Sequence, residues 1–259
     1  MLRASFLPVQ SRMSEQTSTP DRGSALRTVV ATAAFALVHS VLAGRRVKEA
    51  VRHAAGDRAA DAWYRVLYNA QAIATSAALA AYVRRLPDRT LYEVHGPMRV
   101  LMRAGQLAGL VFGALAVREV GTSRMAGTAS LAAWARGERD VPAAPEAQGP
   151  APDATGRLAS GGPFAHSRHP LNLAPLPVLW LNPRMTVNLA AFNTAATLYL
   201  ALGSRHEEAR LAAAYGDEYE TYRRSGVSFY LPLSSGAVAA PVGRESGVLP
   251  LADHGRGAA

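Results

Sequence analysis

The stretch PFAHSRHPLNLAPLPVLWLNPRMTVNLAAFNTAATLYLALGSRHEEARLAAAYGDEYETY, residues 163–222, places an apolar run between two compact polar clusters. The first cluster is residues 166–169 and the second is residues 205–208. Charged side chains next to hydrocarbon are costly unless they are paired or serve a site. Two such clusters at the ends of one apolar segment therefore need a structural explanation.

The apolar run is too long for one simple membrane span, and the sequence LNPRM interrupts it. Asn182 and Pro183 indicate a turn, because proline cannot continue a helix without losing a backbone hydrogen bond. We therefore predict a helical hairpin whose first arm, residues 171–181, is only about 16 Å long and need not cross a bilayer fully. Either way, the hairpin brings the two polar clusters together on one side.

Three further windows upstream are apolar enough to enter a bilayer, judged against the ~20 residues that a spanning helix needs. They are residues 28–44, about 62–82 and about 97–117. Together with the hairpin they predict an all-α polytopic membrane protein with about five membrane helices and a C-terminal amphipathic helix. Gly105, Gly109 and Gly113 share one face of the third window, and we interpret them as a packing stripe that lets another helix approach closely.

The composition agrees with this class and excludes several others. Hydrophobic residues make up 49% of the chain and charged residues 18%, and the net charge is +9 with Lys48 as the only lysine. The arginines lie in short connectors beside apolar windows, which suits lipid headgroups better than nucleic acid. We therefore expect a lipid bilayer and no nucleic acid among the partners. The absence of cysteine excludes disulfides, thiolate metal sites and a cysteine nucleophile.

The expected domain covers residues 25–232, with a flexible insert rich in Pro, Ala and Gly at about 137–161. We expect residues 1–24 to be a disordered extension and residues 233–259 a disordered tail. Neither the acceptor nor the oligomeric state is defined by the sequence.

The basic connectors indicate the orientation. Residues 45–58 form the most basic short connector, so we place it, and with it both polar clusters, in the cytoplasm of a bacterial inner membrane. The connector on the opposite side, residues 83–96, is also basic, so the positive-inside bias is incomplete.

The hairpin places Arg168, His169, Glu207 and Glu208 within reach of one small molecule. Arginine offers a planar fork for a carboxylate, and glutamates accept hydrogen bonds from an ammonium or from ribose hydroxyls. Such a cluster suits a zwitterionic ligand that carries a nucleoside.

The two clusters also carry a family resemblance. GPFAHSRHPLN, then the hairpin, then SRHEEARLAAAYGDEYETYRR, resembles the C-terminal signature of the integral-membrane methyltransferases. These include isoprenylcysteine carboxyl methyltransferases, phospholipid methyltransferases and bacterial methanethiol S-methyltransferases. The family pattern is R-H-P-x-Y, then E-E, then G-x-x-Y-x-x-Y. The residues that match are Arg168, His169, Pro170, Glu207, Glu208, Gly216, Tyr219 and Tyr222.

This sequence departs from the pattern at Asn172, where the family has tyrosine. Asparagine keeps hydrogen bonding but lacks the aromatic face. In the N-terminal half, HSVLAGRRVK and WYRVLYNAQA are similar to the bacterial thiol-methylating and NnrU-like branch.

The resemblance implies that S-adenosylmethionine binds between the R-H-P turn and the E-E segment, facing a tunnel into the membrane. It implies catalytic roles for Arg168, His169 and Glu208, and no metal. The implied cofactor contacts are His166, Arg168, His169, Pro170, Asn172, Glu207, Glu208 and Tyr219.

Methyl transfer from a sulfonium is an in-line displacement, so the protein mainly orients the reactants and excludes water. The positive charge of Arg168 favours an anionic acceptor, either a small or lipophilic thiol or an isoprenylcysteine-like carboxylate. A lipid amine would need a base, for which His166 and His169 are the candidates.

Other interpretations fit some of these residues. Tyr215, Tyr219 and Tyr222 also fit anchors at the membrane interface. His39 is most simply an interhelical hydrogen-bonding residue, although it also suits an acceptor cavity. A haem- or metal-binding membrane isomerase, as a resemblance to the NnrU-like proteins would imply, is one alternative function, and a non-catalytic assembly factor is another. The ligands of the metal alternative are His39, His166, His169, His206 and Glu207.

Overall fold

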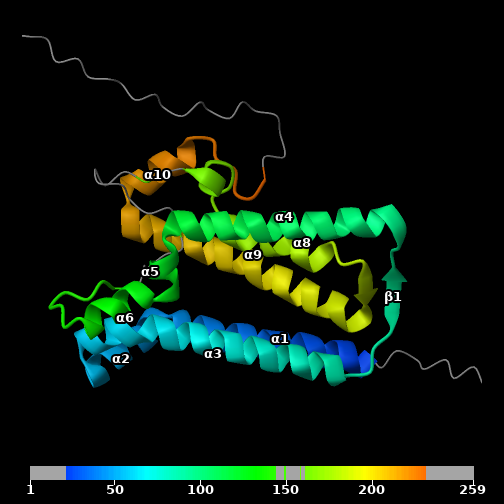
Figure 1. Cartoon of the computed structure of the whole chain (residues 1–259), viewed down its shortest axis with the longest axis horizontal. Coiled ribbons are helices and arrows are strands. Elements are labelled where there is room, and N and C mark those ends of the chain that lie inside the picture. Colours follow the sequence, from blue (N-terminus) through cyan, green and yellow to red (C-terminus); the bar gives the residue numbers. More distant parts are fainter. Residues whose placement is uncertain (1–21, 144–148, 150–157, 159–160, 232–259) are drawn as a thin grey trace, which may run out of the picture.

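The computed structural model describes residues 22–143, 149, 158 and 161–231. This part of the chain is mostly helical (Figure 1). The helices are α1 (Arg22–Ala43), α2 (Arg45–Ala55), α3 (Asp57–Arg85), α4 (Gly96–Val120), α5 (Thr122–Ala126), α6 (Thr128–Ala135), the 3-10 helix η1 (Gly162–Ala165), α7 (Pro170–Leu173), α8 (Pro175–Trp180), α9 (Val187–Tyr215) and α10 (Asp217–Arg224). Two short strands, β1 (Thr90–Glu93) and β2 (Arg184–Thr186), pair antiparallel.

Within the residues that the structure describes, three helices, α1, α3 and α4, are long and apolar enough to cross a membrane. The three predicted windows fall on these helices. Their large apolar side chains point outward rather than into a core; Leu26, Leu67 and Leu107, for example, are each at least 60% exposed. A helix that exposes hydrocarbon in this way needs an apolar environment around it.

The glycine stripe of α4 is where α7 and α8 pack. A Cβ atom at Gly109 would lie 2.8 Å from the carbonyl oxygen of Ala174, and one at Gly113 would lie 3.0 Å from the Ala174 side chain. Gly105 faces Leu181 in the same way. The prediction of a packing stripe is confirmed.

The first arm of the predicted hairpin consists of two short helices. The chain breaks at Ala174 because Pro175, which follows, has no N–H to continue the helix. The second arm is the long helix α9, which runs antiparallel beside α7 and α8. Trp180 Nε1 donates to Thr197 Oγ1 at 2.9 Å, and Asn193 Nδ2 donates to the Leu179 carbonyl at 2.6 Å. That both arms cross a bilayer stays a prediction.

The two-stranded sheet is absent from the all-α prediction. It joins the connector after α3 to the turn before α9, pairing Thr90 with Thr186 and Glu93 with Arg184. Nearby, the Ser24 hydroxyl donates to the Pro87 carbonyl at 2.6 Å, and Asn188 Nδ2 donates to the same carbonyl at 3.0 Å. These bonds fix the starts of α1 and α9 against the end of α3.

The termini and the insert fall mostly outside the described residues. Arg22–Ser24, at the end of the predicted disordered extension, are helical, so the prediction is wrong for these three residues. Residues 1–21 and the tail 232–259 are not among the described residues. Within the predicted flexible insert, Gly149 is buried, and Leu158 packs against the core cluster that contains Leu211.

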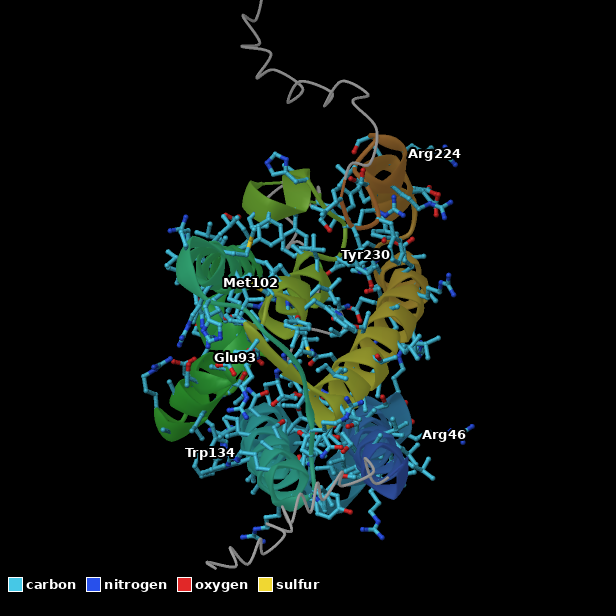
Figure 2. All side chains as sticks on the ribbon, turned by 90° about the vertical axis from the view of Figure 1, so that its right-hand side faces the viewer. Arg46, Glu93, Met102, Trp134, Arg224 and Tyr230 are labelled. Atoms are coloured by element: carbon cyan, nitrogen blue, oxygen red, sulfur yellow. The ribbon has the colours of Figure 1, made fainter. Side chains whose placement is uncertain are left out.

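Several connectors are more ordered than predicted. The basic connector after α1 is the helix α2, in which Arg52 forms an ion pair with Asp61 of α3. Figure 1 shows α2, α5, α6 and α10 at one end of the molecule and β1 at the other. Figure 2, viewed from the β1 end, shows α1 and α3 below α4 and α9, with Arg46 and Arg224 projecting outward. The most basic connector and both polar clusters therefore lie at the same end of the bundle.

Candidate functional site

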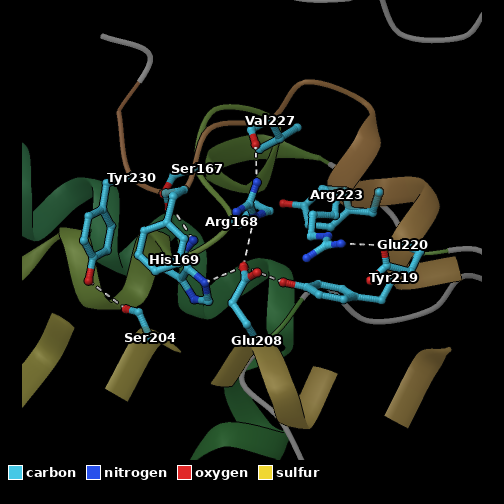
Figure 3. Close-up of polar contacts among 12 residues, drawn as sticks. Ser167, Arg168, His169, Ser204, Glu208, Tyr219, Glu220, Arg223, Val227 and Tyr230 are labelled. Carbon is cyan, nitrogen blue, oxygen red and sulfur yellow. Dashed lines mark hydrogen bonds and ion pairs between the residues drawn. The ribbon is translucent and has the colours of Figure 1, made fainter. Parts of the chain in front are cut away.

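The Glu208 carboxylate is the centre of the polar cluster at this end (Figure 3). Its Oε1 accepts hydrogen bonds from Arg168 Nε at 2.9 Å, from His169 Nε2 at 2.9 Å and from the Tyr219 hydroxyl at 2.7 Å. Arg168 and Glu208 are 40 residues apart in the sequence. We call Arg168, His169, Glu208 and Tyr219 the Glu208 cluster.

The R-H-P turn fixes its two functional side chains through its backbone. His169 precedes the first turn of α7, and Pro170 stands at the first helical position, where its missing N–H costs nothing. The backbone N–H of His169 donates to the buried hydroxyl of Ser167 at 3.2 Å. The backbone N–H of Arg168 donates to the Ser228 carbonyl at 2.9 Å. These bonds hold both side chains toward α9.

The segment after α10, residues 225–231, closes over the cluster. The Val227 carbonyl accepts from Arg168 Nη1 at 2.9 Å. The Phe229 ring lies 5.5 Å from the Arg168 guanidinium carbon and 4.6 Å from the centre of the His169 ring. The Tyr230 hydroxyl is hydrogen-bonded to Ser204 Oγ at 2.8 Å.

This segment is not among the site residues predicted from the sequence. The available signal is the adjacent aromatic pair Phe229 and Tyr230 within an otherwise small and polar stretch. Gly226 adopts a φ of +89° directly after α10, and this left-handed conformation lets the chain turn back toward the cluster.

The Arg168–Glu208 ion pair is largely shielded but still reachable from outside. The side chain of Arg168 is 15% exposed, that of Glu208 is 19% exposed and that of His169 is only 2% exposed. Burial raises the pKa of Glu208, but the hydrogen bonds from Tyr219, Arg168 and His169 outweigh this and leave the pKa below its ordinary value. Glu208 is therefore a carboxylate at neutral pH.

The two neutral donors of the cluster stay neutral because they are buried. Burial lowers the pKa of His169, and the opposing effect of Glu208 is smaller. His169 is therefore neutral near pH 7 and donates from Nε2 to Glu208. Burial and the contact with Glu208 both raise the pKa of Tyr219, so its phenol keeps the proton that it donates.

The interpretation of the C-terminal tyrosines as interfacial anchors is wrong for two of them. Tyr219 and Tyr222 are buried, and both pack against Leu211 of α9. The Tyr222 hydroxyl donates to the Phe164 carbonyl at 2.7 Å. These two residues attach α10 to α9 and η1, while Tyr215 is only half-buried.

The remaining predicted site residues lie in different places. Asn172 Nδ2 donates to Ser204 Oγ at 2.9 Å, so it links α7 to α9 beside the Glu208 cluster. Pro170 is buried at the start of α7. Glu207 is half-buried on α9, and its charge acts on both His169 and Arg65 of α3.

His166 is exposed, and within the described ranges its side chain makes no contact with the Glu208 cluster. A direct contact to a ligand bound at the cluster is therefore not supported for this residue.

Two atoms of the cluster have spare hydrogen-bonding capacity. In the part of the chain that the structure describes, Arg168 Nη2 and Glu208 Oε2 have no hydrogen-bond partner. A guanidinium nitrogen suits a ligand carboxylate, and a carboxylate oxygen suits an ammonium or a hydroxyl. The Phe229 ring lies against the Arg168 guanidinium, and Tyr230 packs edge-on against Phe229. The residues present therefore fit a zwitterionic ligand with a planar base.

The metal alternative is not supported by the arrangement of its ligands. Among the residues in the described ranges, no three His, Asp or Glu side chains lie close enough to hold one metal ion. His39 instead contacts Tyr68 through Nε2 at 2.6 Å, and His206 is exposed on α9.

Comparison with known proteins identifies relatives of one class, the bacterial methyltransferases that act on a small thiol. The chain is similar to proteins named methanethiol S-methyltransferase. The one from Crocosphaera subtropica is 38% identical over 61 residues, which is 24% of each chain. The one from Mycobacterium tuberculosis is 42% identical over 65 residues, which is 25% of this chain and 26% of the relative. The one from Pseudomonas deceptionensis is 34% identical over 65 residues, which is 25% of this chain and 24% of the relative.

The chain thus matches about a quarter of the length of each of these curated relatives. No protein-family model and no solved structure matches it. These relatives confirm the resemblance to this class of methyltransferase.

Proposed function

We propose that this protein is an integral-membrane methyltransferase that uses S-adenosylmethionine to methylate a small or lipophilic thiol. The observation that carries the proposal is the contact between Arg168 and Glu208 across 40 residues of sequence, with Nη2 and Oε2 left available to a ligand. The similarity to methanethiol S-methyltransferases supports the reaction class. The apolar outer faces of α1, α3 and α4 support a membrane location.

The Glu208 cluster and the closing segment would hold the cofactor. Arg168 would bind its carboxylate, because a guanidinium fork matches that group. Glu208, with Glu207 beside it, would accept from the ammonium or the ribose hydroxyls. Phe229 and Tyr230 would contact the base. When bound, S-adenosylmethionine supplies an electrophilic methyl group attached to a sulfonium.

The state of His169 favours a thiol acceptor over an amine. A neutral amine needs a base at the reacting atom. His169 is 2% exposed, and its Nε2–H is already donated to Glu208. We therefore assign His169 a positioning role rather than a catalytic one. A thiol reacts as its thiolate, which the positive charge of Arg168 stabilises.

A labelled-methyl transfer assay on membranes tests this proposal. The acceptors are methanethiol, a longer alkyl thiol, an isoprenylcysteine analogue and a lipid amine. We expect labelled thioether from at least one thiol, and loss of that product in Glu208→Gln. The exposed neighbour variant Arg205→Ala is the control and should keep the activity. Methylation of the amine alone, or of no acceptor by well-folded protein, would contradict the assignment.

A further inference from the structure

A cavity of about 630 Å³ is lined by residues of both strands and of the adjoining helices. Figure 1 shows that β1 lies at the opposite end of the bundle from α10, which carries Tyr219 of the Glu208 cluster. The cavity is bounded by α1, α3, α9 and the two strands. Its walls are mostly apolar. The apolar lining includes Phe35, Leu79, Ala80, Val83, Leu189 and Phe192.

The cavity runs from the end of a membrane helix toward its middle. Ser76 and Arg84 of α3 both line it, and eight residues of helix correspond to about 12 Å. Arg84 stands in the last turn of α3, and Arg184 stands just before α9. In a bilayer the arginines therefore lie near headgroup depth, while the apolar walls extend into the hydrocarbon.

The rim of the cavity carries an excess of positive charge. Arg84 has no carboxylate partner within the described ranges, and there the side chain of Arg184 donates only to Thr90 Oγ1 at 3.3 Å. Asp88 also lines the cavity, but its Oδ1 accepts from the backbone N–H groups of Arg89 at 2.8 Å and Asn188 at 3.0 Å. The two arginines outnumber this one carboxylate. The positive-inside bias does not explain them, because the end predicted to be cytoplasmic is the other one.

The frame of the cavity is held by buried hydrogen bonds. Ser24 Oγ contacts Asn188 Oδ1 at 3.0 Å, and both residues bond the Pro87 carbonyl. Ser24 and Asn188 are fully buried. A cavity whose walls are fixed before a ligand arrives binds with a smaller ordering cost.

We propose that this cavity binds one anionic phospholipid, with the phosphate on Arg84 and Arg184 and an acyl chain against the apolar walls. The excess positive charge selects an anionic headgroup over one that also carries a cation. The apolar walls select a lipid over free phosphate, because burial of hydrocarbon against them is favourable. The inference depends on the membrane location proposed above, but not on methyl transfer.

Thermal melting of the full-length protein in uncharged detergent tests the site. A ligand that binds the folded state raises the melting temperature. We expect dioleoylphosphatidylglycerol to raise it clearly more than dioleoylphosphatidylcholine does, and inorganic phosphate to leave it unchanged. In Arg84→Gln/Arg184→Gln the phosphatidylglycerol effect should fall by at least about half. The matched control Arg85→Gln/Arg89→Gln removes the same net charge near the same end of α3, from two residues outside the cavity lining, and should keep the effect.

A second variant tests the apolar wall independently of the charges. Ala80→Phe keeps both arginines and fills part of the cavity, so it should also reduce the phosphatidylglycerol effect. Equal rises in melting temperature with both lipids would overturn the proposal. An equal loss of the phosphatidylglycerol effect in the two arginine double variants would overturn it as well. If inorganic phosphate raised the melting temperature as much as phosphatidylglycerol does, the two arginines would bind a soluble anion and the lipid proposal would be wrong. If the arginine pair variant does not fold, native mass spectrometry of wild type and Ala80→Phe with both lipids decides, and equal retention of the two lipids refutes the site.

Discussion

Glu208 shows how one carboxylate oxygen organises a site. Three donors from two parts of the chain converge on Oε1: Arg168 and His169 of the R-H-P turn, and Tyr219 of α10. Hydrogen bonds to an ionised acceptor are roughly twice as strong as neutral ones. They hold the side chain in place and leave Oε2 for a ligand. The same three hydrogen bonds therefore keep Glu208 ionised and orient its carboxylate toward a ligand.

The first prediction concerns binding at this residue. Arg168→Ala and Glu208→Gln each remove one partner of a largely buried charge-assisted contact, which costs on the order of 2–5 kcal/mol. Binding of S-adenosylhomocysteine should weaken by ~30-fold or more, at ~1.4 kcal/mol per factor of ten. Calorimetric titration measures this in variants that keep a wild-type melting profile.

The control for this titration is Arg205→Ala, because Arg205 is exposed on the same helix. It should bind S-adenosylhomocysteine as wild type does. Unchanged affinity in both Arg168→Ala and Glu208→Gln would show that the Glu208 cluster is not the cofactor site.

The second prediction concerns His169 and pH. Its pKa is lowered in the folded protein, whereas in the unfolded chain it takes a proton near pH 6.5. The unfolded state therefore binds more protons as the pH falls below about 6.5, and folding stability decreases there by up to about 1.4 kcal/mol per pH unit. Glu208, whose pKa is also lowered, contributes a loss only below about pH 4.3.

Comparison with His169→Gln isolates the contribution of His169 to the pH dependence of stability, because all other histidines are the same in both proteins. Melting temperatures are measured in detergent between about pH 7.5 and 5. The wild type should lose more stability on acidification than the variant does. Parallel pH curves would show that His169 is not held neutral by the fold.

At the scale of elements, the sequence predicted those features that depend on residues close together in the chain. The three long apolar windows, the break at Asn182-Pro183 and the glycine stripe all depend on neighbouring residues, and the structure has helices, a turn and close packing there. The pairing of β1 with β2 depends on two connectors that meet only after the helices have packed. The position of Phe229 over Arg168 likewise depends on where α10 docks.

The same division between local and long-range features applies to the candidate site. The R-H-P turn and the E-E segment identify Arg168, His169 and Glu208 because the two arms of the predicted hairpin place them together. Tyr219 belongs to the family pattern, but its burial depends on the long-range contact with Leu211. Polar spacing alone does not separate Glu208 from Glu207, whereas helix geometry does, since successive residues on α9 point in different directions.

The third prediction tests the packing of α4 against α7 and α8. Gly109→Ala places a Cβ atom 2.8 Å from the Ala174 carbonyl oxygen and 3.2 Å from Pro177 Cβ, so the backbone must shift. Such overpacking costs about 1–3 kcal/mol. The matched variant is Gly203→Ala in α9, where nothing lies within 4 Å of the new Cβ. It should be neutral or stabilising by about 0.5–1 kcal/mol.

Thermal melting in detergent distinguishes the two alanine variants. Gly109→Ala should melt at a lower temperature than wild type, and Gly203→Ala at the same or a higher one. A Gly109→Ala protein as stable as wild type would mean that α8 does not approach α4 as closely as described.

At the scale of the whole molecule, the two ends of the bundle differ in chemistry. Figure 1 shows α2 and α10 at one end and β1 at the other. The Glu208 cluster belongs to the first end, and the cavity lined by Arg84 and Arg184 belongs to the second. We therefore infer that the proposed methyl transfer and the proposed lipid binding take place at opposite membrane surfaces. Because the two sites are separate, a variant at one of them should leave the other function intact.

The last prediction fixes which end faces the cytoplasm. The chain has no cysteine, so single cysteines introduced into it report unambiguously. His206→Cys and Ala54→Cys replace exposed residues on α9 and α2, at the end that carries the most basic connector. By the positive-inside bias, both should react only with membrane-permeant thiol reagents in intact cells. Leu91→Cys, on β1 at the opposite end, should react with an impermeant reagent. Impermeant labelling of His206→Cys and Ala54→Cys together would reverse the orientation, whereas different labelling of these two would contradict the arrangement of the bundle itself.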